Sequence, residues 1–138
     1  MEMFYSLQGE GFYQGRAAFF IRLAGCDVGC VWCDVKESWD ASKHPTLSIE
    51  DIVAAAKVHP GRLAIITGGE PLLYNLDPLT IALKAAGFET NIETSGSSPM
   101  SCYTHIYNHC AWFDHISSYK LWNTHSHHHY ICIFTSSN

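Results

Sequence analysis

The chain has 138 residues, of which 47% are apolar and 15% charged, with a formal net charge of -5 and a pI near 5.9. This length suits one domain, and the acidic balance gives no electrostatic reason to expect nucleic acid or an anionic membrane as a partner. No run approaches the ~18 continuous apolar residues of a membrane span, and residues 1–10 lack the basic and apolar regions of a signal peptide. We therefore predict a cytoplasmic protein that acts on a small molecule.

The pattern of the first part of the chain predicts a parallel α/β unit. Short apolar runs at 17–24 and 62–67 predict two buried strands, each followed by glycine, and FETNIET at 88–94, closed by serine-glycine, predicts a third strand. Helical patterns fill the two intervals between these runs. Strands that alternate with helices through short connections pair in parallel with right-handed crossovers.

Two helices are predicted between the strands. The first begins after Ser48, whose side chain suits an N-cap, and the second begins after Asp77 as its N-cap and ends before Gly87. In parallel α/β folds, ligand sites gather at the carboxyl ends of strands. The segments that follow those ends are residues 26–34, TGGEP and ETSG. We therefore expect the functional residues at one edge of the sheet.

Cys26, Cys30 and Cys33 form a CxxxCxxC pattern directly after the first predicted strand. Three thiols in one loop indicate metal or redox chemistry more than disulfides. A structural zinc site needs four ligands, and His44 is the candidate for a fourth. A [4Fe-4S] cluster held by three thiolates instead leaves one iron open for a substrate or cofactor atom. The remaining interpretation, cysteines as small buried hydrophobic residues, conflicts with the loop that Gly29 indicates.

Arg22 interrupts the first apolar strand on the face that it shares with Ala18 and Phe20. A buried guanidinium is costly unless an anion pairs with it. The arginine therefore predicts a substrate carboxylate, which suits bidentate binding. A structural ion pair with Glu10 or Glu70 is the alternative.

Taken together, these motifs resemble those of the radical S-adenosylmethionine (SAM) enzymes. Their cluster loop has the same cysteine spacing and an aromatic residue, here Trp32, before the last cysteine, and the GGEP segment at 68–71 matches the segment with which they hold SAM. The segments FYSLQGEG at 4–11 and FIRLAGC at 20–26 resemble the 7-carboxy-7-deazaguanine synthases of queuosine biosynthesis, a tRNA modification pathway. The resemblance extends over residues 3–98.

This resemblance implies a fold and a reaction. The fold is a partial, truncated (β/α) barrel of the radical SAM type. The open iron of a [4Fe-4S] cluster binds SAM, and reductive cleavage of SAM starts the conversion of 6-carboxy-5,6,7,8-tetrahydropterin to 7-carboxy-7-deazaguanine, a lyase-type ring contraction with loss of ammonia. An electron donor such as flavodoxin or ferredoxin is implied as a partner, and a homodimer is compatible with the family.

The resemblance also assigns roles to individual residues. The cluster ligands are Cys26, Cys30 and Cys33. The implied SAM contacts are Trp32, Cys33, Asp34, Gly68, Gly69, Glu70 and Glu93. The implied pterin contacts are Leu7, Gln8, Gly9, Glu10, Arg22 and Thr67. For Glu93, which points away from its strand neighbours, exposure to solvent is the alternative to a contact with the ribose hydroxyls.

Two features depart from the family. Val35 stands where the family usually has a threonine that binds Mg²⁺, and valine has no oxygen to offer the ion. Residues 97–138 contain no glycine and only two charged residues, but hold seven of the nine histidines. We interpret residues 1–96 as an incomplete radical SAM core and residues 97–138 as an aberrant segment. A frameshift is the leading explanation, and zinc capture by HSHHHY or disorder are the alternatives.

Two other functions compete with the synthase. A different radical SAM enzyme, such as a glycyl-radical activase, shares the cysteines and GGEP but has no need for Gln8, Glu10 and Arg22 together. The other alternative is an inactive metal-binding fragment.

Overall fold

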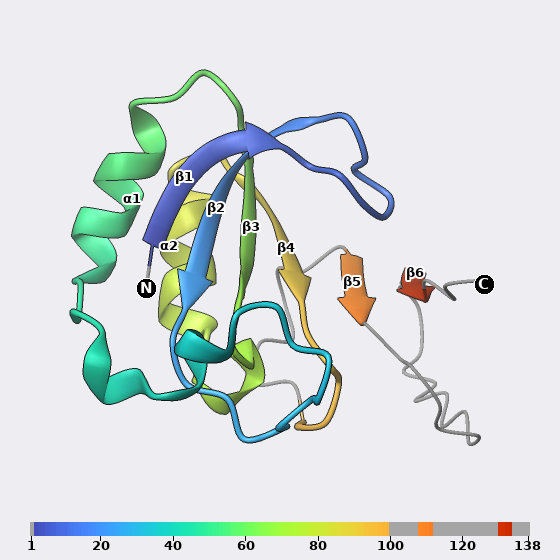
Figure 1. Cartoon of the computed structure of the whole chain (residues 1–138). Helices are drawn as coiled ribbons and strands as arrows, with labels where there is room; N and C mark the ends of the chain where they lie inside the picture. Colours follow the sequence, from blue (N-terminus) through green and yellow to red (C-terminus); the bar gives the residue numbers. More distant parts are fainter. Residues whose placement is uncertain (1, 100–107, 112–129, 134–138) are drawn as a thin grey trace.

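The computed structural model describes residues 2–99 and the backbone of residues 108–111 and 130–133. Its strands and long helices are β1 (Glu2–Leu7), β2 (Ala17–Leu23), α1 (Ile49–Lys57), β3 (Leu63–Gly68), α2 (Asp77–Ala85), β4 (Glu89–Glu93), β5 (Asn108–Ala111) and β6 (Tyr130–Ile133) (Figure 1). Short 3-10 helices lie in the loops at η1 (Lys36–Trp39), η2 (Ala41–Lys43) and η3 (Pro71–Leu73).

The strands form one sheet in the order β1-β2-β3-β4-β5-β6. The parallel pairing predicted for the three central strands is confirmed, because β2 pairs in parallel with β3 and β3 with β4. The sequence analysis missed β1, which pairs antiparallel with β2 at the edge of the sheet. Both α1 and α2 lie on one side of the mixed sheet (Figure 1). Among the described residues no helix covers the other side, here called the open face.

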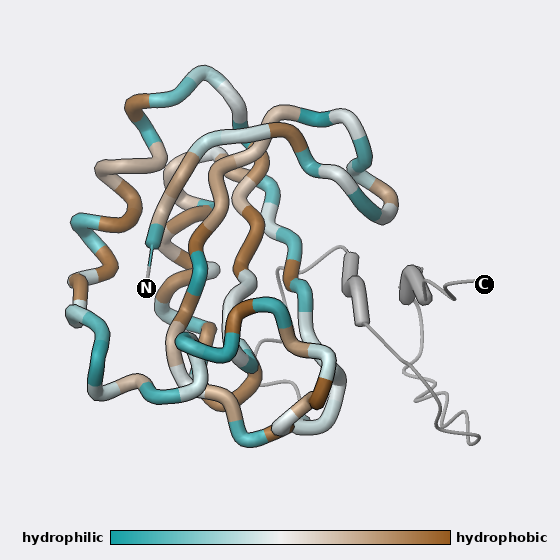
Figure 2. Tube along the Cα trace, viewed as in Figure 1, coloured by the Kyte–Doolittle hydropathy of each residue, from teal (hydrophilic) through white to brown (hydrophobic). Residues whose placement is uncertain are grey.

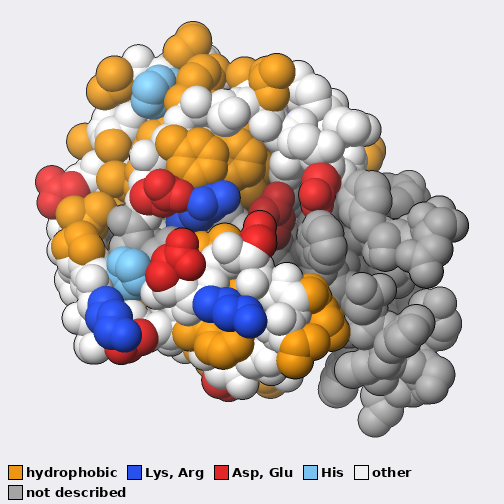
Figure 3. All heavy atoms as spheres, in the orientation of Figure 1, with side chains coloured by type: hydrophobic (Ala, Val, Ile, Leu, Met, Phe, Trp, Pro, Cys, Tyr) orange, Lys and Arg blue, Asp and Glu red, His pale blue; other side chains and the backbone are white. Residues whose placement is uncertain are grey.

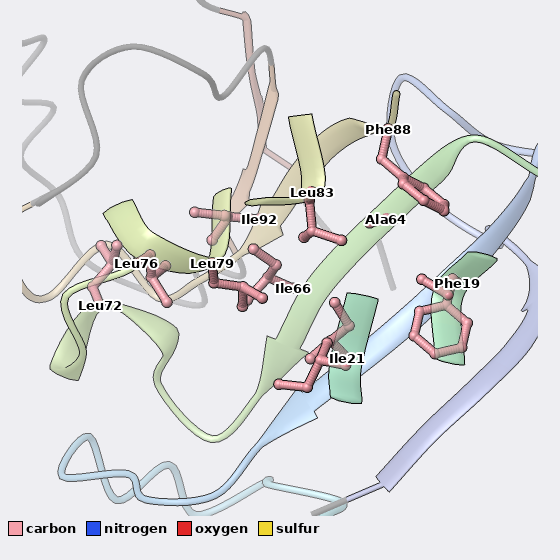
Figure 4. Close-up of a cluster of buried hydrophobic side chains, with 12 residues drawn as sticks. Phe19, Ile21, Ala64, Ile66, Leu72, Leu76, Leu79, Leu83, Phe88 and Ile92 are labelled. Atoms are coloured by element: carbon pink, nitrogen blue, oxygen red, sulfur yellow. The ribbon is translucent and has the colours of Figure 1, made fainter. Parts of the chain in front are cut away.

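The helix-covered face holds the larger core. Alternate residues of β2, β3 and β4 point to this side because successive strand residues face opposite ways. They pack against apolar residues of α1, α2 and the adjoining loops, and Figure 2 shows polar and apolar residues alternating along α1 as this packing requires. The labelled members of this core in Figure 4 are Phe19, Ile21, Ala64, Ile66, Leu72, Leu76, Leu79, Leu83, Phe88 and Ile92.

The open face changes from apolar to polar along the strands. Near the amino ends of β2 and β3 a small cluster forms, with Ala18, Phe20 and Ile65 among its members. Arg22 lies beyond Phe20 on the same face and is in register with Thr67 of β3. The apolar part supports the sheet, and the polar part lies at the edge where the sequence predicts a ligand site.

The two helix starts have different outcomes. The prediction for Ser48 is confirmed, because its Oγ accepts a hydrogen bond of 3.1 Å from the backbone N–H of Asp51. The prediction of Asp77 as N-cap is wrong, because α2 begins at Asp77 itself and Leu76 takes the cap position without a side-chain hydrogen bond. The side chain of Asn75 accepts from the Asp77 N–H at 3.1 Å, so the chain turns into the helix one residue early.

Residues 97–138 lie mostly outside the described part of the chain. The backbone segments β5 and β6, which the sequence analysis did not predict, extend the sheet in parallel beyond β4. The frameshift, zinc-capture and disorder interpretations fall on the residues that are not described. In the described part, no helix combines the length and apolar character needed to cross a bilayer.

Candidate functional site

Three loops meet at the edge where the central parallel strands end. They follow β2, β3 and β4, and they lie together at the lower edge of the sheet in Figure 1. Figure 3 shows acidic and basic side chains gathered near these strand ends on the face turned to the viewer. The expectation that the predicted motifs would share one edge is therefore met by the fold.

The cysteine loop presents three free thiols. Cys26, Cys30 and Cys33 are each partly buried, and none forms a disulfide. Partial burial raises the pKa of Cys30, and negative charge on Cys26 and Cys33 raises this pKa further. Bound iron cations would remove this opposition to ionisation, because a thiol that coordinates a metal is deprotonated. The donor set therefore suits an iron–sulfur cluster.

The loop does not form a zinc tetrad with His44. Within residues 2–99, no three His, Cys, Asp or Glu side chains converge closely enough to hold one metal ion. The ring Nε2 of His44 instead lies 2.9 Å from the backbone oxygen of Glu37. An iron–sulfur cluster differs from a single ion in this respect, because its thiolates bind separate iron atoms.

The residues around the last cysteine differ in exposure. Trp32 is 55% exposed, Asp34 is exposed and Val35 is half-buried. Trp39 was not singled out by the sequence analysis, but its indole N–H donates to the Sγ of Cys33 at 3.4 Å. This contact ties η1 to a predicted cluster ligand.

The TGGEP loop packs directly on the end of β2. The N–H of Gly69 donates to the carbonyl of Leu23 at 3.0 Å, and the N–H of Glu70 donates to that of Gly25 at 2.9 Å. Gly68 has a φ of +113°, and a Cβ there or on Gly69 would collide with these same backbone atoms. The glycines thus allow two loops of the site to touch, which is a role apart from the SAM contact implied by the resemblance.

Glu70 is almost fully buried, with 1% of its surface exposed. Its carboxylate accepts from the N–H of Leu72 and the N–H of Ser95, each at 2.9 Å, and from the hydroxyls of Thr94 and Ser95. The alternative in which Glu70 forms an ion pair with Arg22 does not hold, because Arg22 pairs with Glu2. Thr94 and Ser95 were not predicted as site residues, although the ETSG segment that contains them was noted as a strand end.

Glu93 joins two of the predicted pterin contacts. Its carboxylate accepts from Gln8 Nε2 and from Thr67 Oγ1, each at 2.8 Å. Gln8 is only 4% exposed and its Oε1 accepts from the backbone N–H of Glu10 at 3.3 Å. The alternative in which Glu93 faces solvent is not supported, because its side chain is partly buried and bonded to Gln8, which follows β1, and to Thr67 of β3. The other members of the LQGE segment are more open, with Leu7 65% exposed, Gly9 exposed and Glu10 half-buried.

Arg22 is less buried than predicted. Its side chain is 34% exposed, forms an ion pair with Glu2 and lies over the ring of Phe4, with the guanidinium carbon 5.1 Å from the ring centroid. The structural ion pair therefore involves Glu2 in place of Glu10 or Glu70. The cause is the antiparallel register of β1, which puts Glu2 opposite Arg22.

Arg22 also borders a cavity. This cavity of about 260 Å³ lies between the start of β1, the end of β2 and residues 41–47. Its lining includes neither the cysteines nor Gln8, Thr67 and Glu93. Arg22 therefore lies on the same face of the sheet as Gln8, Thr67 and Glu93, but it borders a cavity that those three residues do not line.

Comparison with known proteins identifies the class. The model of the Radical SAM superfamily matches residues 20–109. A crystal structure of QueE from Escherichia coli superposes with a TM-score of 0.73 and 37% identity, over 80% of this chain and 58% of that one. The chain belongs to the radical SAM superfamily, and its mixed sheet is a part of the radical SAM fold.

Curated relatives are named 7-carboxy-7-deazaguanine synthase. The one from Flavobacterium psychrophilum is 50% identical over 73% of this chain and 48% of its own length. The one from Synechocystis is 48% identical over 72% of this chain and 48% of its own length. The one from Escherichia coli is 40% identical over 73% of this chain and 54% of its own length. The resemblance expected from the sequence is confirmed, and the chain spans about half the length of these relatives.

Proposed function

We propose that this chain carries the cluster and SAM site of a radical SAM lyase that forms 7-carboxy-7-deazaguanine from 6-carboxy-5,6,7,8-tetrahydropterin. The observation that carries the proposal is the hydrogen-bonded group of Gln8, Thr67 and Glu93 at the strand ends beside the cysteine loop. A glycyl-radical activase shares the cysteines and GGEP, but it has no use for a glutamine from LQGEG held at this place. Relatives named for the synthase support the same choice.

The residues of the site divide into three tasks. The thiolates of the cysteine loop hold a [4Fe-4S] cluster, and Trp39 orients one of them by its N–H···S contact. The backbone of Gly68 and Gly69 lies against the end of β2 beside this loop, where it holds the methionine part of SAM. In this proposal Glu93 accepts hydrogen bonds from ribose hydroxyls, and its bonds with Gln8 and Thr67 support the proposal because they fix its orientation.

The bound cofactors supply the difficult chemistry, which is one-electron cleavage of SAM to start hydrogen abstraction. The protein supplies position and keeps water away. The apolar cluster of Phe20 and its neighbours occupies the part of the open face next to the polar group. An apolar surface of this kind, which excludes water, protects reactive species from solvent.

We further propose where the reaction takes place and which partners it uses. We place the reaction in the cytoplasm, with flavodoxin or ferredoxin as the electron donor. For Mg²⁺, Val35 offers no oxygen, so water or a nearby carboxylate takes the place of the usual threonine. We also propose a homodimer, which fits the family.

The direct test is turnover by the whole chain. The protein is reconstituted with iron and sulfide without oxygen, and then incubated with SAM, dithionite and the carboxytetrahydropterin. Mass spectrometry is expected to detect 7-carboxy-7-deazaguanine. Deoxyadenosine without this product would favour another radical SAM enzyme, and a cluster whose spectrum ignores SAM would favour the inactive fragment.

Substitution of Arg22 tests whether the substrate is bound through a carboxylate. We expect Arg22→Lys to weaken binding of the carboxylated pterin roughly tenfold or more, because lysine keeps the charge but loses the two-pronged contact with a carboxylate. The matched control is Arg16→Lys, since Arg16 also pairs with a glutamate, Glu89, at 2.8 Å but precedes β2 at the opposite end. Equal losses in the two variants, measured by titration calorimetry, would assign Arg22 a structural role only.

A further inference from the structure

We propose that Glu70 is a positioning residue that holds the loops after β2, β3 and β4 at a fixed separation, with Thr94 and Ser95 as its partners. The inference deepens the proposed function and rests on it, because the loops concerned are those proposed to hold the two ends of SAM. Glu70 itself does not touch the cofactor in this proposal. It acts through the segments that do.

Both carboxylate oxygens of Glu70 accept hydrogen bonds from groups inside the protein. One oxygen accepts from the Leu72 N–H and the Thr94 hydroxyl, and the other accepts from the N–H and hydroxyl of Ser95. The residue is 1% exposed, and no Lys or Arg among residues 2–99 forms an ion pair with it. A buried carboxylate without a cation depends on its hydrogen bonds, so these four donors are held firmly in place.

Glu70 also binds the loop after β2. Its backbone N–H donates to the carbonyl of Gly25, which directly precedes Cys26. The neighbouring Gly69 N–H donates to Leu23, and a Cβ at Gly69 would collide with Gly25. One residue therefore connects the cysteine loop through its backbone with the loop after β4 through its side chain.

A fixed separation of the loops favours a ligand that the site recognises at both ends. The proposed methionine contacts precede Glu70, and the proposed ribose contact, Glu93, directly precedes Thr94. When two subsites are held at the span of a linked ligand, binding one end raises the effective concentration of the other. Looser loops reduce this gain without changing either subsite. The affinity for intact SAM should then fall while the affinities for its separate parts persist.

The experiment measures three dissociation constants on the cluster-loaded chain by titration calorimetry, for SAM, methionine and adenosine. We expect Glu70→Gln and Ser95→Ala to weaken SAM binding roughly tenfold or more. Methionine and adenosine should bind as they do to the unaltered chain. The matched control is Ser97→Ala, because the Ser97 hydroxyl lies 2.9 Å from that of Ser95 without a hydrogen bond to Glu70.

A second pair of variants covers the case in which Glu70→Gln does not fold. Thr94→Val removes the hydroxyl that Glu70 accepts from and should weaken SAM binding, whereas Thr94→Ser keeps the hydroxyl and should restore it. Thermal unfolding is followed in parallel. Loss of stability with no change in the SAM affinity relative to its parts would overturn the proposal, and so would an equal loss of methionine affinity, which indicates direct contact.

The outcomes separate this inference from the proposed function. If the unaltered chain binds SAM and the variants lose it as expected, but no 7-carboxy-7-deazaguanine forms, the lyase assignment fails and the positioning role stands. If product forms and all variants bind SAM equally, the positioning role fails and the lyase assignment stands. A cluster-loaded chain that does not bind SAM overturns both.

Discussion

Replacement of Cys30 by alanine is expected to abolish assembly of the iron–sulfur cluster. Only three thiols are present in the cluster loop, all of them free and partly buried, so the loop has no spare ligand. Loss of a supporting contact around a metal typically costs ~10–100-fold in affinity, and loss of a ligand should cost more. Cys26→Ala and Cys33→Ala are expected to behave in the same way.

The measurement is bound iron and sulfide after anaerobic reconstitution, together with visible absorbance. The matched control is Cys102→Ala, which removes a cysteine outside the CxxxCxxC loop. It should load the cluster as the unaltered chain does. Retention of iron by Cys30→Ala and its loss in Cys102→Ala would move the metal site away from the cysteine loop.

Replacement of Leu83 by alanine should lower the free energy of unfolding more than any other substitution proposed for this chain. This leucine is fully buried on α2 in the core of the helix-covered face (Figure 4). Buried Leu→Ala changes cost ~2–5 kcal/mol, because they remove apolar contacts and leave a cavity. Since the total free energy of unfolding of a domain is only about 5–15 kcal/mol, this variant should be close to unfolding at room temperature.

The control for Leu83 lies on the same helix. Ile81 is 53% exposed, so Ile81→Ala should change the free energy of unfolding by only about 0.5 kcal/mol. Urea titration followed by circular dichroism compares the two. Similar losses in both variants would contradict the packing of α2 described here.

Local sequence patterns were sufficient for the elements that depend on neighbouring residues. The Ser48 cap, the apolar runs of β2 and β3 and the spacing of the cysteines each involve groups a few residues apart. Such groups interact in nearly the same way wherever the segment lies in the fold. The exception, Asp77, failed because the side chain of Asn75 competed for the same turn.

Register and long-range contacts were decided by the tertiary structure. Glu2 became the partner of Arg22 only because β1 pairs antiparallel with β2, and no local pattern had marked β1 as a strand. The bonds from Glu70 to Thr94 and Ser95 cross 24 and 25 positions, and the bond from Gln8 to Glu93 crosses 85.

The sequence alone therefore determined the order of the motifs and the strand ends that they follow, because local hydrogen bonding and the alternation of strand side chains depend on nearby residues. Which of those residues touch one another was decided by the sheet. Pairing partners are selected by the combined packing of many distant residues, and their choice cannot be read from any one segment.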